Sequence, residues 1–373
     1  MKPYKYILFP LLLLPFVTSC TKEENVEGPV SLNPNVAGVS ITRAAINDVS
    51  GLHDKNIGFY VVNAKGFTND TDPTKEISYG IRPTGTYGKY VGTTETEGEG
   101  ESQKTTFAPN GADQTIWLNH EKAIVFCCYP APASKDGIQN DPAGAANGSD
   151  PVPTIAVSTD AIKLTNTANT SDKYTFDYTQ SDYDYMYGVD AKNTPTSTTQ
   201  PYANNGHATP SGETGLNNEV SITLKHAFAQ LCLKVKKSAD YKGDANVTSV
   251  KYTSKIPVLK DGTRMKLTDG TFVNLDNTES ATDKIYEYII SMNASTDDSN
   301  ILTFTNYAVP CSSSIAATIS LIVDKKEMSV DCTSNWSAGF IYTYTVQINP
   351  TGLELTGINV VGWQDSSITD TTI

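Results

Sequence analysis

The sequence predicts an all-β protein built of β-sandwiches, and two features of the 373-residue chain lead to this prediction. Tyrosine is abundant, at 20 residues, and charged residues make up only 18%, which is typical of extended strands and not of helical bundles. Short runs of alternating apolar and polar residues recur along the chain, separated by Gly, Pro, Asn and Asp turn signals. The length fits two sandwich domains once a leader is removed.

The first twenty residues have the features of an export signal. Lys2 and Lys5 precede a short apolar run at 7–17, and small residues precede Cys20. The run is too short and too interrupted by proline to span a bilayer, so we predict a signal peptide at residues 1–19. Its end resembles a bacterial lipobox, which implies cleavage before Cys20 and lipid on that cysteine. The alternative is ordinary signal cleavage beside an incidental cysteine.

Five cysteines follow Cys20, and an odd number excludes a complete set of disulfides within one chain. Cys127 and Cys128 are adjacent in the apolar run 123–129, so a strand there would send their side chains to opposite faces. No Cys/His spacing matches a zinc site. We therefore expect free, buried thiols at Cys127, Cys128, Cys232, Cys311 and Cys332.

In the first half of the chain, predicted strands alternate with long polar stretches. Residues 21–35 are polar and contain two prolines, so we expect a flexible tether, followed by an extended segment with Val39 and Ile41 on one face. The region 63–112 is expected to form loops or hairpin excursions. Strands are predicted at 57–62, 115–118 and 123–129. Residues 190–218 lack apolar periodicity and are predicted to connect an N-terminal domain (44–218) to a C-terminal domain (219–373).

The second half of the chain has the more regular strand pattern. The clearest strand is Phe340–Ile348, where Phe340, Tyr342, Tyr344, Val346 and Ile348 share one face. A turn at 350–352 and a terminal hairpin ending at Trp363 follow it. Further strands are predicted at 220–224, 231–235, 247–252, 285–290, 301–307 and 317–323.

The sequence carries no readable catalytic, metal or cofactor motif, so an enzyme is not predicted and no cofactor is expected. The net charge of −13 argues against nucleic-acid binding. His226 lies between apolar residues, and we interpret it as a hydrogen-bonded core histidine, not a ligand. Asp182 and Asp184 alternate on a strand-like segment, and we expect a solvated face.

Several motifs in order along the chain resemble the fimbrillin family, the type V pilus subunits of Bacteroidales. The resemblance covers nearly the whole chain, and the order and spacing of its motifs are more specific than any one of them. They are the lipobox at Cys20, the segment Ile41-Thr-Arg43-Ala44-Ala45, the motif Asp184-Tyr-Met-Tyr-Gly188, the run 220–235, and the strand 342–346 with the hairpin ending at Trp363.

The resemblance implies two transthyretin-like sandwiches in tandem and assembly by strand exchange with other fimbrial subunits. Lipid on Cys20 would hold the precursor in the outer membrane. An arginine-specific protease would cut between Arg43 and Ala44, so that residues 20–43 leave with the strand carrying Val39 and Ile41. The donor segment stays open between two candidates. The polar tail 364–373 has only Ile368 and Ile373 as apolar anchors, and the terminal hairpin is the better candidate, through Leu353, Leu355, Ile358, Val360 and Trp363.

Two questions stay open at this level. The position of the subunit, as stalk, tip or accessory component with or without a host or bacterial receptor, is not fixed by the motifs. The alternative function is a monomeric surface lipoprotein that binds glycan through tyrosines of the segment 174–187.

Overall fold

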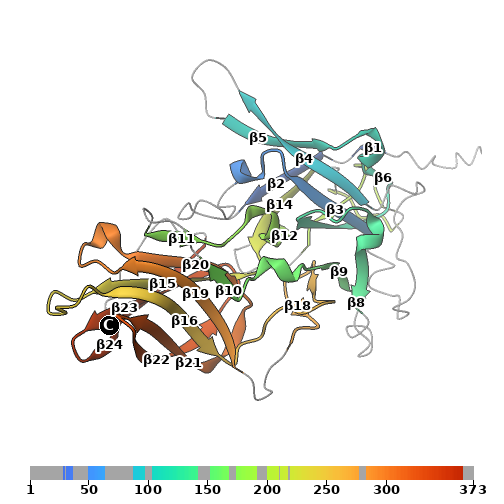
Figure 1. The fold of residues 1–373 in the computed structure, drawn as a ribbon. Helices are drawn as coiled ribbons and strands as arrows, with labels where there is room; N and C mark the ends of the chain where they lie inside the picture. The colour runs from blue at the N-terminus through green and yellow to red at the C-terminus, as the bar shows by residue number, and fades with distance from the viewer. Residues whose placement is uncertain are drawn as a thin grey trace, which may run out of the picture.

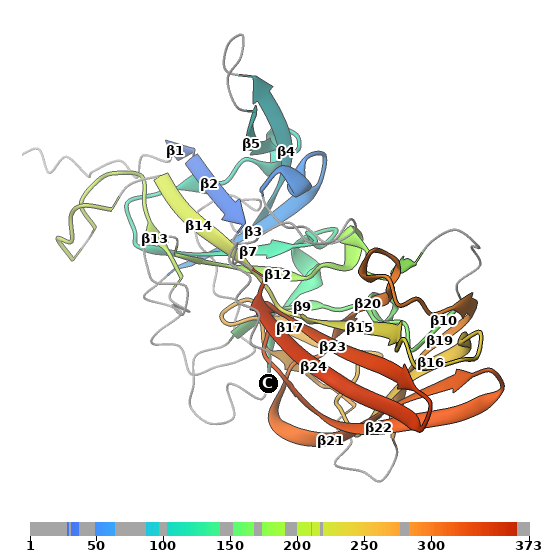
Figure 2. The ribbon, with the colours of Figure 1, turned by 90° about the vertical axis from the view of Figure 1, so that its left-hand side faces the viewer.

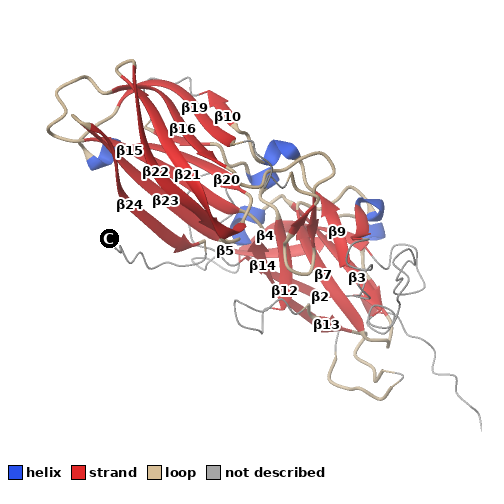
Figure 3. Cartoon of the chain, turned by 90° about the horizontal axis from the view of Figure 1, so that it is seen from below, coloured by secondary structure: helices blue, strands red, loops and turns tan. Residues whose placement is uncertain are grey.

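The computed structural model describes residues 28–29, 31–36, 49–63, 87–96, 103–141, 152–167, 174–190, 200–209, 211–216, 219–276 and 283–363. This part of the chain consists of strands and loops with short 3-10 turns, as Figure 3 shows, so the all-β prediction is confirmed. No helix in the described residues is long and apolar enough to cross a membrane. The turns are η1 (Val49–Leu52), η2 (Ala112–Gln114), η3 (Lys135–Gly137), η4 (Thr159–Ala161), η5 (Ser181–Tyr183) and η6 (Asp298–Asn300).

An eight-stranded sheet, called here the large sheet, organises the N-terminal half (Figure 1). Its hairpin of β4 (Tyr87–Thr96) with β5 (Gln103–Pro109) lies in the region 63–112, where loops or hairpin excursions were expected. A two-stranded pair, β1 (Gly28–Pro29) with β6 (Trp117–Leu118), lies apart from it. In order, the large sheet contains β2 (Ser31–Val36), β14 (Glu219–His226), β12 (Met186–Asp190), β7 (Ala123–Tyr129), β3 (Asn56–Asn63), β4 (Tyr87–Thr96) and β5 (Gln103–Pro109), with β13 (Tyr202–Ala203) paired to β7.

The large sheet is apolar on both faces, and this explains the continuous apolar sequence of β3 and β7. Alternate residues of these strands belong to different clusters, called here the main core and the second core. Phe126 and Cys128 face the main core, whereas Val125 and Cys127 face the second core. The predicted opposite orientation of the two adjacent cysteines is therefore confirmed.

Two five-stranded sheets form a sandwich in the C-terminal half, visible as two layers in Figure 2. The aromatic rings of Tyr252 and Tyr344, from opposite sheets, lie 5.5 Å apart in the main core. The first sheet has the order β10 (Thr165–Thr167), β19 (Lys284–Asn293), β16 (Asn246–Ser254), β21 (Cys311–Val323) and β22 (Lys326–Trp336). The second has the order β11 (Thr175–Asp177), β20 (Leu302–Ala308), β15 (Ala229–Lys237), β23 (Phe340–Asn349) and β24 (Gly352–Gly362).

The strand predicted with the clearest alternation is confirmed with one exception. Tyr342, Tyr344, Val346 and Ile348 are buried along β23. Phe340, at the first position, is instead 40% exposed. It is the first residue of the strand, and its partner across the ladder is Gly362, which has no side chain to pack beside the ring.

Strand pairing crosses the predicted domain division at 218 and 219 in both directions. β10 and β11 precede the division but pair in parallel with β19 and β20 of the C-terminal sandwich. Conversely, β17 (Arg264–Lys266) and β18 (Phe272–Val273) form a four-stranded sheet with β9 (Val152–Ala156) and β8 (Ile138–Asp141). β14, just after the division, belongs to the large sheet. The division itself stays a prediction, and the two halves share one main core.

Gly188 of β12 marks a close approach of three strands in the second core. A Cβ atom at this position would lie 2.6 Å from both Cys127 Cβ and Ile222 Cγ2. We expect Gly188→Ala to lower the free energy of unfolding by about 1–3 kcal/mol, because neighbouring strands have to move apart. Gly357→Ala is the matched control, since a Cβ there meets open space. Equal urea midpoints for the two variants would contradict this packing.

The cysteines of the described chain are free, and four of them are buried, as the sequence predicted; Cys332 is partly exposed. Burial raises the pKa of the Cys128 thiol to about 12, and burial likewise raises the pKa of the phenols of Tyr178 and Tyr187 to about 12. These groups stay neutral in the folded chain at pH values where they ionise in the unfolded chain.

The direction of the resulting pH dependence follows from these raised pKa values. Below about pH 7.5 both states keep their protons, so the groups make no difference to stability. Above this pH the unfolded chain loses protons first, and the free energy of unfolding should fall continuously toward pH 12. Urea unfolding at pH 8 and pH 10.5 measures the effect, and Cys128→Ala should make the decline shallower. A constant urea midpoint over this range would disprove it.

Candidate assembly site

β2 is the edge strand at one end of the large sheet. It pairs in parallel with β14 over six residue pairs, from Ser31 with Glu219 to Val36 with Leu224. Figure 2 shows the two strands side by side. The prediction of a flexible tether over 21–35 is therefore wrong for the described residues 28–29 and 31–36. Pro34 obscured the strand in the sequence, but a proline is tolerated on an edge strand because one side of that strand needs no partner.

β14 carries the apolar side chains that lie next to this edge. Val220, Ile222 and Leu224 are fully buried in the second core, together with Met186 of β12. The intervening Ser221 and Thr223 are half-buried on the other face. A chain that lost β2 would therefore present unpaired backbone donors and acceptors along β14, beside an apolar row.

Several residues singled out in the sequence lie outside the described residues. They are Cys20, Val39, Ile41, Arg43 and Ala44. The last described residue before them is Val36, which is paired with Leu224 at the end of β2.

The candidate donor residues lie on β24, the edge strand of its sheet in the described chain, and on Trp363 just after it. β24 pairs with β23 along its whole length, with an irregularity between Thr345 and Val346. Leu353, Leu355 and Ile358 are half-buried against the main core, and Val360 is 47% exposed. Trp363, by contrast, is fully buried. Residues 352–362 thus form one long strand and not a separate hairpin.

A buried polar pair lies where the large sheet meets the C-terminal sandwich. His226 Nδ1 lies 2.8 Å from Asp184 Oδ1, and neither side chain is exposed. The interpretation of His226 as a hydrogen-bonded core residue is confirmed. The prediction of a solvated face for Asp182 and Asp184 is wrong for Asp184, whose side chain is buried. No local signal in the sequence indicates this burial, because the partner His226 lies 42 positions away. Asp182 is exposed and pairs with Lys55.

The tyrosines behind the glycan-binding alternative are packed into the protein. Tyr185 and Tyr187 are buried, and Tyr178 stacks on Tyr288 with 5.4 Å between ring centroids. Tyr174 and Tyr183 are half-buried against the main core. These side chains do not form an exposed stacking platform.

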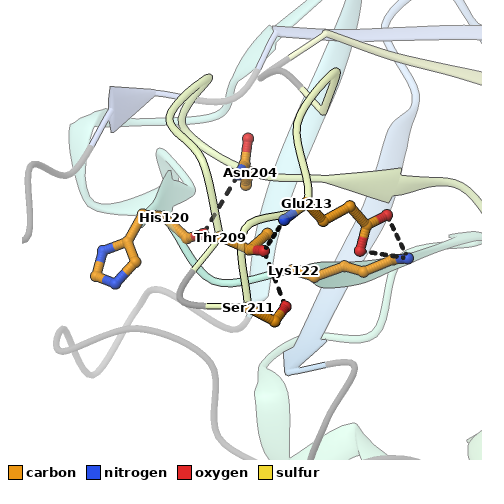
Figure 4. Close-up of polar contacts among 6 residues, drawn as sticks. All are labelled: His120, Lys122, Asn204, Thr209, Ser211 and Glu213. Atoms are coloured by element: carbon orange, nitrogen blue, oxygen red, sulfur yellow. Dashed lines mark hydrogen bonds and ion pairs between the residues drawn. The ribbon is translucent and has the colours of Figure 1, made fainter.

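Polar contacts join the loop after β13 to the residues just before β7 (Figure 4). Lys122 Nζ lies 2.8 Å from Glu213 Oε1 and 4.3 Å above the Tyr202 ring. Thr209 Oγ1 accepts a hydrogen bond from Glu213 N, and the His120 ring points away from these groups. These contacts hold the loop in place. They do not bring an acid, a base and a nucleophile together. Among the described residues, no three His, Cys, Asp or Glu side chains could hold a metal ion.

The sequence from residue 42 to residue 363 matches the family model described as fimbrillin-like. This match covers most of the chain, including β14 and the terminal strand β24. The chain therefore belongs to the fimbrillin-like family, a family of structural subunits of surface fimbriae. No curated protein is significantly similar in sequence.

Solved structures of distant sequence cover most of the chain. A protein assigned to cell adhesion from Bacteroides uniformis is 16% identical, with 90% of this chain and 98% of that chain covered and a TM-score of 0.46. A fimbrial protein from Bacteroides vulgatus is 16% identical, with coverages of 90% and 99% and a TM-score of 0.40. A fimbrial assembly protein from Parabacteroides distasonis is 11% identical, with coverages of 92% and 98% and a TM-score of 0.42.

Proposed function

We propose that this fimbrial subunit is exported as a lipoprotein precursor, matures by proteolysis and assembles by strand exchange. Lipid on Cys20 holds the precursor in the outer membrane after residues 1–19 are removed. An arginine-specific protease cuts between Arg43 and Ala44, and the mature subunit joins other fimbrial subunits in a filament that serves adhesion.

The observation that carries this proposal is the position of β2. This strand lies inside the segment 20–43 that processing would release, and within the described chain its partner is β14 alone. Cutting after Arg43 therefore detaches an edge strand without breaking any other strand of the large sheet. The vacated edge offers backbone hydrogen bonds for affinity and the row Val220, Ile222 and Leu224 for specificity.

The donor strand in this proposal is β24, carried by a neighbouring subunit. β24 lies at a sheet edge, and Glu354 is its single charged residue. A donor on one end of the molecule and an acceptor on the large sheet make a head-to-tail contact, which propagates instead of closing. Each subunit added then presents a new vacant edge or a new donor.

Mass spectrometry of the N-terminus of material sheared from the cell surface tests the processing step. We expect chains that begin at Ala44 in the filament, and chains that begin with acylated Cys20 in the membrane fraction. Arg43→Gln should leave all of the protein in the second form. Surface filaments whose subunits keep acylated Cys20 would exclude this route. A lipidated monomer without filaments would favour the lipoprotein alternative.

A further inference from the structure

Complete side-chain burial at the terminal strand is confined to one residue, Trp363, directly after β24. The residues of β24 itself are half-buried or exposed, and none of them is fully buried. Trp363, the residue that follows β24, has no exposed surface. A large aromatic ring buried in this way accounts for much of the apolar area that would be lost if the strand left.

The partner of the Trp363 ring is the imidazole of His226, at the end of β14. The two rings are stacked, with 3.8 Å between their centroids and an angle of 9° between their planes. Asp184 fixes the orientation of the imidazole through its 2.8 Å contact with Nδ1. The indole also lies near Tyr307, with 6.0 Å between ring centroids.

Backbone hydrogen bonds tie the same point to neighbouring segments. Trp363 N donates to the carbonyl oxygen of Gly339, just before β23, over 2.6 Å. Gly339 N in turn donates to the carbonyl oxygen of Phe228, between β14 and β15, over 2.8 Å. The end of the terminal strand is thereby joined to the end of β14, the strand that β2 covers.

We propose that the stacked rings of Trp363 and His226 form a latch that keeps β24 in its own sandwich and sets how readily this strand is released to a neighbouring subunit. The inference rests on the proposed function, in which β24 is the donor. Releasing β24 requires Trp363 to leave its buried site and exposes the face of an imidazole that Asp184 continues to hold. The residues of β24 offer no comparable anchor.

Hydrogen–deuterium exchange of the unassembled full-length precursor measures the latch directly. We expect Trp363→Leu to accelerate exchange of the β24 amides by about 100-fold, selectively over β19 and β16. The matched control is Trp336→Leu, which removes a buried indole at the end of β22 in the same sandwich. It should accelerate β21 and β22 at least as much as β24.

Two milder variants keep the test decisive if Trp363→Leu does not fold. Trp363→Phe retains an aromatic ring and should accelerate β24 selectively by about 10-fold. His226→Gln removes the stacked ring but keeps an amide N–H that can donate to Asp184, and the same selective effect is expected. Uniform acceleration across the sandwich in these variants would overturn the latch.

Assembly of the trimmed subunits supplies the second readout. Once residues up to Arg43 are removed, Trp363→Phe subunits should assemble faster than wild-type subunits. If hydrogen–deuterium exchange of β24 is accelerated selectively but assembly is not faster, the latch has no role in strand release, and β24 is not the donor. The processing step of the proposed function would be unaffected by that result, because the N-terminus at Ala44 decides it independently.

Discussion

Trypsin at low dose is expected to cut the precursor first after Arg43 and to convert monomers into a ladder of oligomers. The cut lies between β2 and η1, so it releases the edge strand while leaving the strands that carry the two cores intact. The unpaired edge of β14 then has six residues of backbone to pair, beside three buried apolar side chains. Size-exclusion chromatography with N-terminal sequencing of the product measures both steps.

Two controls separate strand exchange from general aggregation. Arg43→Gln should resist the first cut and stay monomeric. A synthetic peptide with the sequence of residues 28–41, added in excess, should refill the edge of trimmed subunits and suppress the ladder, whereas a scrambled peptide should not. First cleavage elsewhere in the chain, with no oligomers formed, would argue strongly against maturation at this position.

A disulfide between β23 and β24 identifies the donor in the same assay. Gln347 and Glu354 lie directly opposite each other, so cysteines at both positions can join the strands. In a Cys332→Ser background, the oxidised variant should be trimmed normally but should not assemble, and reduction should restore the ladder. Assembly of the oxidised form would transfer the donor role from β24 to residues 364–373.

Neither half of the chain is expected to fold alone when it is divided at residue 218. Fragment 44–218 lacks β14, β17 and β18, and fragment 219–373 lacks β10 and β11. Each fragment also exposes part of the main core, for instance Ile155 in one and Met265 in the other. Burial of one such side chain is worth about 1.5–3 kcal/mol, and a few of them equal the net stability of a typical domain.

Circular dichroism and urea titration of the separate and mixed fragments test this expectation. The separate fragments should show no cooperative transition, and refolding them together should restore one. The control is the full chain cut once within the loop residues 211–216, which should stay folded. A cooperative transition in either isolated fragment would show that folding does not require the strand pairing between the two halves.

Strands with a strong local pattern were predictable from the sequence. β7 and β23 owe their structure to runs of apolar or alternating residues that hold regardless of context. β22 was not predicted, because Ser334 occupies an inward position and charged residues lie at its start. The three-residue strands β10 and β11 have almost no pattern of their own and exist because β19 and β20 offer partners far along the chain.

The candidate site shows the same division between local and distant information. Val220, Ile222 and Leu224 alternate visibly in the sequence, so the apolar row of β14 was predictable. The identity of the strand covering them was not, since Ser31–Val36 is polar and contains Pro34. The pairing of Asp184 with His226 and the stacking of His226 on Trp363 join three distant segments, and no spacing rule signals such a contact.

The strand crossing between the halves has a consequence for secretion. Arg264 of β17 contacts Thr154 of β9 across 110 positions, so the β8–β9 pair lacks its neighbour β17 until most of the polypeptide has been delivered. Contacts so distant in sequence form slowly, because the intervening chain has to be closed into a loop first. A polypeptide that passes through a translocon with its N-terminus first would therefore stay unfolded, and able to pass through the pore, until the last third of the chain arrives.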